Sequence, residues 1–460
     1  MRGVPVVNEP KYYPLSSIQR GLAFLFRFYP DLHILNLATR LDFEEEIDEE
    51  LLLRAIRETE DRVAFLKVRL HMQDSETMVQ YLYEGEPAPV EIVDLSDRTD
   101  DEIAKIMHDW TYDAFPNSII DEQLYSFKLV RCPEGKRSLY VCVEHFIIDG
   151  YSTLFLLDYL DRVYAALATG GELPERTQEP WKLVESDLAF AVSEKYQKQL
   201  LKAEAEFETE PVFTSINGLG APEFIEGKRY GKTMDISRLD GGCIRLPIPA
   251  ALAARVDACA KQLNISPSNF YFLALRSYLG HVSGTDDVTI CTSIAASRIT
   301  KYEKSAGLDF ATQQLIRTVV SGETGFTDAL LQLSVTQNDV LRHARSRSVD
   351  LSKWLHERYE VPFGCEYYTM QYSYLPLYDL SDKYLKFVPS YVSNGQSNQP
   401  CYLLILPGDR SGTLSATYVY SLADTKPENI ERYHRFMLAF LDNAMNEPEL
   451  TIQQLIDKSL

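Results

Sequence analysis

The sequence predicts an α+β protein made of two lobes, each a β-sheet backed by helices. Short runs of β-branched and aromatic residues alternate with longer segments whose apolar residues recur at helical spacing. The order strand, helix, helix, strand occurs in both halves of the chain. A length of 460 residues favours two or more domains. We place the boundary in the connector 169–176, which gives lobes of residues 1–176 and 177–460.

The first lobe is expected to begin with a helix at Leu15 to Gln19 that a serine caps. Acidic residues 44–50 lead into a second helix, and a third spans 101–113. The predicted strands are 36–43, 63–70, 79–83, 90–94, 124–130 and 139–143. The last two strands are expected to pair, and a helix then runs on to Gly170-Gly171.

The second lobe is expected to start with one long, charged helix from Glu185 to Glu208, followed by an irregular stretch at 211–230. Ser266-Pro267 caps a helix over 269–278. The other predicted helices are 250–263, 327–347 and the closing amphipathic helix 428–446. The predicted strands are 243–247, 288–294, the broken strand 306–310 with 314–319, and 367–374, 402–406 and 413–420.

The composition excludes several classes of protein. The chain is 45% hydrophobic and 25% charged, which is ordinary for a soluble globular protein. Its 67 acidic and 46 basic residues give a net charge of -21, which argues against nucleic-acid partners and against anionic membrane surfaces. No signal peptide and no apolar run near the ~20 residues of a membrane span are seen. Seven scattered cysteines without a Cys-x-x-Cys pair are typical of reduced thiols, so we expect a cytoplasmic protein.

One stretch joins a buried strand to a helix and carries the candidate chemistry: Glu144-His145-Phe146-Ile147-Ile148-Asp149-Gly150-Tyr151-Ser152. Strand alternation places His145 at the end of an apolar face and Glu144 on the opposite face. An imidazole titrates near neutrality and can accept the proton of an attacking nucleophile. Asp149 offers an orienting carboxylate, and a backbone amide near Gly150 could favour an oxyanion. From the pattern alone, a satisfied buried histidine is the alternative.

Other chemistries have little support. Metal binding lacks ligands near the motif, and no His-x-x-x-His pair occurs. No Gly-x-Ser-x-Gly elbow, P-loop or Gly-x-Gly-x-x-Gly is present, and Ser152 is most simply a helix cap. The tyrosine-rich run 367–374 could line a substrate tunnel, but a core strand explains it as well.

The motif resembles the His-His-x-x-x-Asp-Gly of nonribosomal peptide synthetase condensation domains, in the superfamily of chloramphenicol-acetyltransferase-like, CoA-dependent acyltransferases. Residues 13–22 are similar to the family's Pro-Leu-Ser-x-x-Gln signature, and 65–70 to its Leu-Arg-x-x-Phe segment. Ser297-Arg298 and 307–317 resemble its Gly-Arg and Gly-x-x-x-Asn-Thr-x-Pro-x-x-Arg. The likeness runs from Tyr13 to the C-terminus. The departures are Glu144 for the first histidine, Asp61-Arg62-Val63 for the usual Arg-His-Glu, and Ala311 and Gln314 for Asn and Pro.

The resemblance implies two acetyltransferase-like lobes with mixed sheets, in a V-shaped pseudo-dimer with an active-site tunnel between them. It implies transfer of an acyl or aminoacyl group from a phosphopantetheine thioester to an amine or alcohol, in nonribosomal peptide or related natural-product biosynthesis. The catalytic motif would be His145, Asp149 and Gly150, with His145 as the base and Asp149 in a structural role. Arg298 would be the structural partner of Asp149, and Glu144, Tyr151 and Ser152 flank the motif.

The same resemblance implies no tightly bound cofactor, because a carrier protein or CoA brings the phosphopantetheine thioester. The expected partners are acyl or peptidyl carrier proteins and a small amine or alcohol, and the expected state is a monomer. No adenylation, carrier or thioesterase segment is seen, so we expect a free-standing protein or an excised module. Two alternatives stay open. One is an acyl-CoA-dependent O- or N-acyltransferase, and the other is a non-catalytic docking module, for which Glu144, Ala311 and Gln314 leave room.

Overall fold

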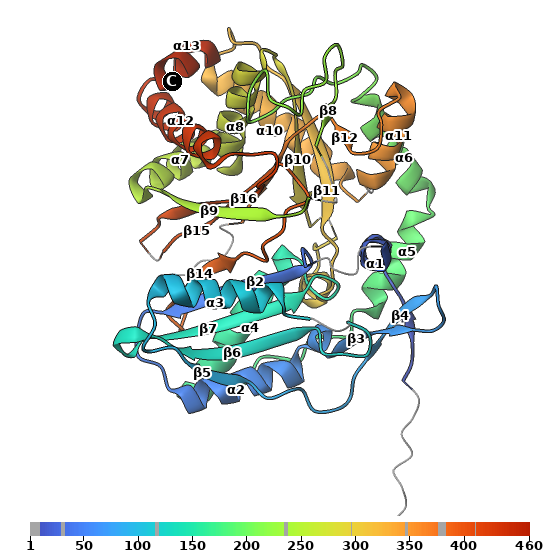
Figure 1. The fold of residues 1–460 in the computed structure, drawn as a ribbon, viewed down its shortest axis with the longest axis vertical. Helices are drawn as coiled ribbons and strands as arrows, with labels where there is room; N and C mark the ends of the chain where they lie inside the picture. Colours follow the sequence, from blue (N-terminus) through green and yellow to red (C-terminus); the bar gives the residue numbers. More distant parts are fainter. Residues whose placement is uncertain are drawn as a thin grey trace, which may run out of the picture. The chain divides into compact units, whose positions relative to one another are not determined.

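The computed structural model describes residues 10–28, 33–115, 119–233, 238–295, 297–345, 348–375, 383–409 and 411–460 (Figure 1). The chain forms two compact units. The first contains Met1–Ala191, Arg298–Phe310 and Lys383–Phe387, and the second contains the remaining segments, Val192–Ser297, Ala311–Asp382 and Val388–Leu460. Each unit therefore combines segments that lie far apart in the sequence. The lobe boundary between residues 176 and 177 stays a prediction.

The main sheet of the first unit is centred on β7 (Arg137–Glu144). It pairs antiparallel with β2 (Asn36–Phe43) on one side and with β6 (Tyr125–Arg131) on the other, and β5 (Glu91–Asp94) runs parallel to β6. A smaller sheet has the order β1 (Tyr13–Pro14), β4 (Met78–Leu82), β3 (Val68–Met72). Because every residue of β7 after Arg137 is buried, the strand has neighbours on both faces, and His145 directly follows it.

Capping residues mark the start of the first helix of the first unit and the end of its fourth. The first helix has a capping box, because Ser16 Oγ accepts from the Gln19 amide and Gln19 Oε1 accepts from the Ser16 amide. Gly170 ends α4 in the left-handed conformation, with φ 71°. Helix α2 packs against α4, and α3 packs against β2. The helices are α1 (Ser17–Phe28), α2 (Glu49–Arg62), α3 (Asp100–Tyr112), α4 (Gly150–Thr169), α5 (Trp181–Ala191) and α9 (Lys301–Ser305), with 3-10 turns η1 (Ala64–Lys67) and η2 (Pro133–Gly135).

The second unit is built on a six-stranded mixed sheet. Its order is β11 (Thr312–Val319), β10 (Asp287–Ile294), β13 (Met370–Tyr374), β15 (Cys401–Pro407), β16 (Leu414–Ser421), β9 (Gly241–Ile248). The pairs β10–β13 and β13–β15 are parallel, and the other three are antiparallel. Two short strands, β8 (Gly231–Lys232) and β12 (Cys365–Glu366), pair with each other. The strand β14 (Phe387–Val392) starts at the last residue of the first unit and continues in the second.

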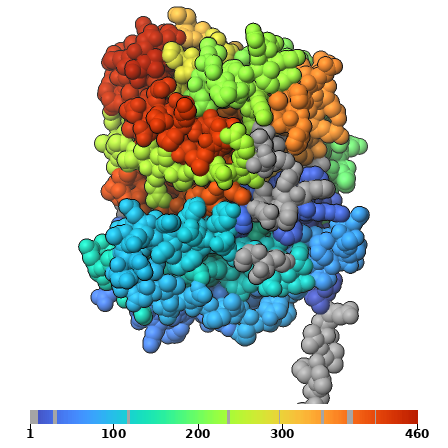
Figure 2. Space-filling model, viewed as in Figure 1, coloured from blue at the N-terminus to red at the C-terminus, as the bar shows by residue number. Residues whose placement is uncertain are grey.

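Helix α8 (Ser268–Ser283) lies at the core of the second unit, with residues 269–280 all buried. It packs against β10, α10 (Phe326–His343) and α12 (Pro427–Asn446). Figure 2 shows α12, in red, at the surface, while its other side buries Ile430, Tyr433 and Phe436 as predicted for an amphipathic helix. The remaining helices are α6 (Glu194–Ala205), α7 (Ala250–Leu263), α11 (Ser348–Tyr359) and α13 (Ile452–Ser459). The predicted α+β class, with mixed sheets backed by helices, is confirmed.

Several predicted elements were wrong in detail. The long helix 185–208 is two helices, because Ser193 Oγ accepts from the Tyr196 amide and starts α6 afresh. The strand 63–70 begins as the 3-10 turn η1, and 306–310 is not a strand. The helix 327–347 ends at His343, and residues 346–347 lie outside the described residues. Helices α9, α11 and α13 and strand β14 were not predicted.

Two general findings concern the described part of the chain. All seven cysteines lie within it and are free thiols. Among the helices of the described ranges, none combines the length and the apolar character needed to cross a membrane.

Candidate functional site

The motif occupies the short loop between β7 and α4 in the first unit. The loop is tight, because the Ile147 amide donates to the Glu144 carbonyl at 3.1 Å and the Ile148 amide donates to the His145 carbonyl at 3.4 Å. Asp149 is the N-cap of α4, and its Oδ1 accepts from the Ser152 amide at 2.7 Å. Asp149 rather than Ser152 therefore caps the helix, which corrects the role predicted for Ser152.

Asp149 forms a fully buried ion pair with Arg298. Arg298 Nη2 lies 2.7 Å from Asp149 Oδ2, and the two side chains are 1% and 0% exposed. The Phe310 amide donates to the same Oδ2 at 3.2 Å. Burial on its own would raise the pKa of Asp149, but the Arg298 guanidinium and the Ser152 amide hold that pKa below its ordinary value. With both oxygens occupied, Asp149 is a fixed anion rather than a group that exchanges protons.

Arg298 ties the motif to a distant segment of the chain. Besides Asp149, its Nη2 donates to Ser152 Oγ at 2.8 Å and to the carbonyls of Gly307 and Leu308 at 2.9 and 2.8 Å. This nitrogen carries only two protons, so the four oxygens share them. Its Nη1 donates to the Glu303 carbonyl at 2.8 Å. We call Asp149, Ser152, Arg298, Gly307 and Leu308 the Arg298 network.

The backbone after Arg298 is held in a conformation that few sequences allow. Gly307 has φ 66° and Leu308 has φ 59°, both in the left-handed region. A Cβ at position 307 would lie 2.1 Å from a ring carbon of Phe65, so only glycine fits. The Leu308 amide donates to the Ile147 carbonyl at 2.8 Å. The segment is therefore fixed to the motif loop immediately before and immediately after Asp309.

His145 lies at the end of β7, where its amide donates to the Leu35 carbonyl at 2.9 Å. Its side chain is 26% exposed, yet its Nδ1 has no exposed surface. This nitrogen lies 3.3 Å from Oδ2 of Asp309, whose side chain is 5% exposed. The approach is within ion-pair distance but lacks the alignment of a hydrogen bond, and Nδ1 has no other acceptor or donor among the described residues. The exposed surface of the side chain therefore belongs to atoms other than Nδ1.

Glu144 is buried beside His145. The residue is 2% exposed, and its Oε2 accepts from the Phe146 amide at 3.3 Å. Burial raises the pKa of Glu144 to about 8. The predicted contrast between the two faces of the strand is absent in burial, because both faces of β7 are covered. At neutral pH Glu144 holds its proton and adds no charge to the site.

The structure thus brings His145, Asp149 and Arg298 together within the first unit. Gly150 is exposed at the first position of α4, Tyr151 is half-buried and Ser152 is buried. No polar contact is found for the Tyr151 side chain among the described residues. The catalytic roles of His145, Asp149 and Gly150 stay predictions.

Sequence reasoning missed two residues that hold this site. Asp309 faces His145, and Gln19 anchors the motif loop. Gln19 is fully buried, donates from Nε2 to the Phe146 carbonyl at 2.9 Å and pairs with the carboxamide of Gln80 at 3.0 Å. Both residues belong to segments that carry the family resemblance, which was the only signal that could have drawn attention to them.

The described residues contain no cluster of three or more His, Cys, Asp or Glu side chains suited to a metal ion.

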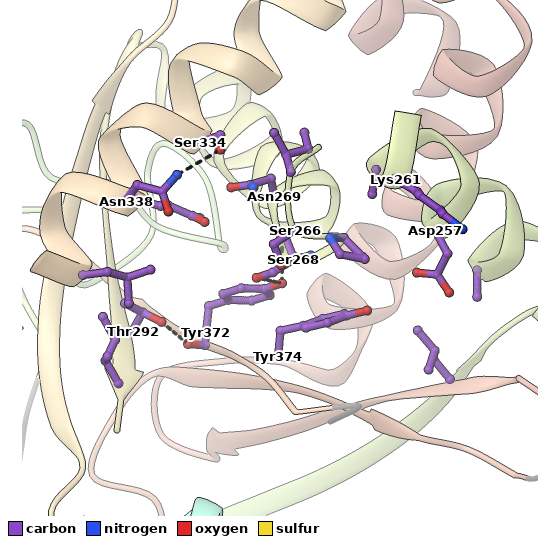
Figure 3. Close-up of a pocket in the computed structure, with 18 of the residues that line it drawn as sticks. Asp257, Lys261, Ser266, Ser268, Asn269, Thr292, Ser334, Asn338, Tyr372 and Tyr374 are labelled. Atoms are coloured by element: carbon purple, nitrogen blue, oxygen red, sulfur yellow. Dashed lines mark hydrogen bonds between the residues drawn. The ribbon is translucent and has the colours of Figure 1, made fainter. Parts of the chain in front are cut away.

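The tyrosine-rich run 367–374 contributes to β13 and to a cavity of about 1050 Å³ in the second unit (Figure 3). Tyr372 and Tyr374 line this cavity, and the Tyr372 hydroxyl donates to the Ser268 carbonyl at 3.0 Å. No histidine or cysteine is among the described residues that line it. The cavity offers hydrogen bonds but lacks an imidazole base.

Comparison with known proteins identifies the relatives of the chain. A family model described as condensation domain matches residues 9–457. Surfactin synthase subunit 1 of Bacillus subtilis (strain 168) is 23% identical over 454 residues, which cover 97% of this chain and 12% of that protein. A linear gramicidin synthase protein of Brevibacillus parabrevis is 22% identical over 460 residues, covering 96% of this chain and 6% of that protein. The chain therefore spans a small part of the length of these curated relatives.

Solved structures share the fold. The first condensation domain of the calcium-dependent antibiotic synthetase, in complex with a substrate analogue, has a TM-score of 0.82 at 18% identity, covering 96% of this chain and 99% of that one. The starter condensation domain of rhizomide synthetase, a mutant in complex with C8-CoA and Leu-SNAC, has a TM-score of 0.75 at 18% identity, covering 96% of each chain. The family predicted from the motif residues is confirmed by these matches.

Proposed function

This chain belongs to the condensation-domain family, whose reaction is acyl transfer with amide-bond formation, and we propose His145 as the base of that reaction here. The observation that supports this proposal is the placement of His145. It follows a buried strand, its side chain is partly exposed, and the loop after it is fixed by the buried pair of Asp149 and Arg298. A partly exposed imidazole on a rigid support meets the geometric needs of a general base.

In the proposed step, the nitrogen of an amine attacks the carbonyl carbon of a thioester. The new C–N bond forms, the C–S bond breaks, and the proton of the amine moves to Nε2 of His145, which returns it to the leaving thiolate. Negative charge develops on the carbonyl oxygen during the attack. Gly150 starts α4, and backbone amides at a helix N-terminus favour such a charge.

Asp149 takes no part in proton transfer in this proposal. Its carboxylate accepts from Arg298 and from the amides of Ser152 and Phe310. A base with both oxygens occupied and a pKa held low would be a poor proton acceptor. Asp149 and Arg298 instead position the loop that carries His145.

The donor is proposed to be an acyl or aminoacyl group on the phosphopantetheine arm of a carrier protein, as the nonribosomal peptide synthetase relatives suggest. The acceptor is a small amine, or an amine on a second carrier, and an alcohol is the second choice. We propose a monomer that works in the cytoplasm in natural-product biosynthesis. Free acyl-CoA is a second candidate donor, because a solved structure of the same fold was determined with C8-CoA.

Transfer to an amine, followed by mass spectrometry, tests the proposal. Wild type is offered acyl groups on carrier proteins and on CoA in parallel, so that the preferred donor is identified. His145→Ala is expected to lower the rate by roughly 10²–10⁴-fold, the usual share of a general base. The matched control is His108→Ala, since His108 is 42% exposed on α3 and should leave the rate unchanged.

Equal rates for His145→Ala and wild type would show that the assigned base is wrong. Binding of a carrier protein with no transfer from any donor would instead favour the non-catalytic docking module.

A further inference from the structure

We propose that Asp309 is the positioning residue of His145, and that it keeps the imidazole proton on Nδ1 so that Nε2 is the basic nitrogen. The inference rests on the proposed function for the role of His145 and deepens it by adding a second residue. Asp309 comes from a segment more than 160 residues away in the sequence, and its carboxylate faces the buried side of the ring, 3.3 Å from Nδ1.

The His145 side chain is unevenly buried. Nδ1 is buried, whereas the side chain as a whole is 26% exposed. Because Nδ1 is buried, a ligand that contacts a ring nitrogen must contact Nε2. The two nitrogens of a neutral imidazole differ, since one donates and the other accepts, and a neighbouring acceptor decides which one carries the proton. A carboxylate at Nδ1 favours a proton there.

Asp309 is fixed in place through its neighbours on both sides. The Leu308 amide donates to the Ile147 carbonyl at 2.8 Å, and the Phe310 amide donates to Asp149 Oδ2 at 3.2 Å. Arg298 Nη2 holds the carbonyls of Gly307 and Leu308. The left-handed conformation of Leu308 is costly for a branched side chain and persists where the surroundings over-determine the backbone. The carboxylate is thus supported as a positioning group needs to be.

Glu144 and Asp149 also carry carboxyl groups near the ring, but they differ from Asp309. Glu144 is directed to the Phe146 amide, and burial raises its pKa to about 8, so it is uncharged at neutral pH. Asp149 is paired with Arg298 and is similarly committed. Asp309 is the acidic group that lies within ion-pair distance of His145 among the described residues.

The contact is looser than a charge-assisted hydrogen bond, which is typically about 2.7–2.9 Å long. Such bonds are often long in unliganded sites and tighten when substrate binds. In the proposed reaction the ring becomes an imidazolium as Nε2 takes the proton of the nucleophile. Asp309 would then accept from Nδ1–H and stabilise the cation, without taking the proton itself.

The direct test is the protonation pattern of His145 in the free protein, which needs no substrate. Nitrogen-15 labelled histidine is read by two-bond proton–nitrogen correlation over a series of alkaline pH values, so that the neutral form of the ring is observed. The signals of His145 among the eight histidines are assigned by their loss in His145→Ala. Wild type is expected to show the Nδ1–H form. A wild-type ring protonated at Nε2 would overturn the proposal.

Variants add a functional readout. Asp309→Asn is expected to shift the ring toward the Nε2–H form and to lower kcat by roughly 10²–10⁴-fold, with KM within about threefold of wild type. Asp309→Glu keeps the carboxylate, so it should keep the Nδ1 proton and more of kcat than Asp309→Asn. The control is Asp97→Asn, which removes one charge from a side chain that is 77% exposed.

The two proposals fail differently. If wild type shows no transfer but its ring is Nδ1–H and changes form in Asp309→Asn, the positioning role stands and the proposed function fails. If transfer is observed and a folded Asp309→Asn retains both the wild-type ring form and kcat, the positioning role is overturned and the proposed function remains.

Discussion

The Arg298 network and the end of β7 lie next to each other in the first unit, yet the acidic groups buried in the two places have different partners. In the network, Asp149 and Arg298 are buried as a pair, and each makes several further hydrogen bonds. Among the described residues at the strand end, the Glu144 carboxyl has no cation beside it and accepts from the Phe146 amide, and the buried Nδ1 of His145 has only Asp309, at 3.3 Å and without hydrogen-bond alignment.

This difference suggests that the Arg298 network supports the motif loop, whereas the groups at the end of β7 are the ones suited to chemistry. A buried charge that is paired with its opposite charge holds the geometry around it. A buried group with few partners has a shifted pKa or an unsatisfied atom, which is costly for stability but useful for chemistry. We therefore expect changes in the Arg298 network to destabilise the first unit, and changes at the strand end to alter its response to pH more than its fold.

The largest expected effect on stability is from Arg298→Ala. The substitution leaves Asp149 charged and buried, which typically costs about 3–5 kcal/mol. Asp149→Asn should cost a similar amount, and the double variant should lose much less than the sum, because the two groups share one interaction. Urea unfolding at neutral pH measures all three. The control is Arg255→Ala, whose pair with Asp442 is exposed and should change stability by less than about 1 kcal/mol. Additive losses would show that the buried pair is not coupled.

A smaller loss is expected when the backbone of the network is changed. Gly307→Ala puts a Cβ against Phe65 at φ 66°, so left-handed strain and overpacking together should cost roughly 2–4 kcal/mol. Gly135→Ala is the matched control. It has φ 75° but no atom within 4 Å of the added Cβ, so it should cost about 1–2 kcal/mol of strain alone. Equal melting temperatures for the two variants would remove the close contact with Phe65 from the explanation.

At the strand end, Glu144→Gln should stabilise the protein in a pH-dependent way. The pKa of Glu144 is about 8 in the folded state and near 4.3 in an unfolded chain, so the folded state alone holds the proton between these values. Stability from this group is therefore present below about pH 4 and is lost as the pH rises toward 8. Glutamine mimics the protonated acid, so the variant should match wild type at low pH. It should exceed wild type by on the order of 2 kcal/mol near pH 8, because relaxation of the site reduces the full linkage value. Parallel stability curves would contradict a buried, protonated Glu144.

Much of the fold could be predicted because local patterns decide it. The strand 36–43 and the helix 250–263 have the predicted bounds, and β6 pairs with β7 as expected. The errors arise where a local capping residue or a tertiary contact overrides the pattern. Ser193 divides a continuous helical periodicity into α5 and α6, and residues 306–310, which look apolar enough for a strand, are held over the motif loop by Arg298.

The candidate site was predictable in its centre and not in its surroundings. The order of residues in the motif located His145 and Asp149, and the family resemblance supplied Arg298 as a partner of Asp149. The left-handed backbone at Leu308, the approach of Asp309 to His145 and the burial of Glu144 all depend on contacts between segments far apart in the sequence. Such contacts leave no periodic trace in a single sequence.

The anchoring of the motif loop by Gln19 has a consequence for the order in which the first unit folds. The hydrogen bond from Gln19 to the Phe146 carbonyl spans 127 residues, and that from Arg298 to Asp149 spans 149. Each closes a long loop, and the entropy of closure is lost before the contact stabilises anything. The hairpin of β6 and β7 has no such requirement and can form early. We therefore expect the strand that presents His145 to be in place before the loop that completes its surroundings.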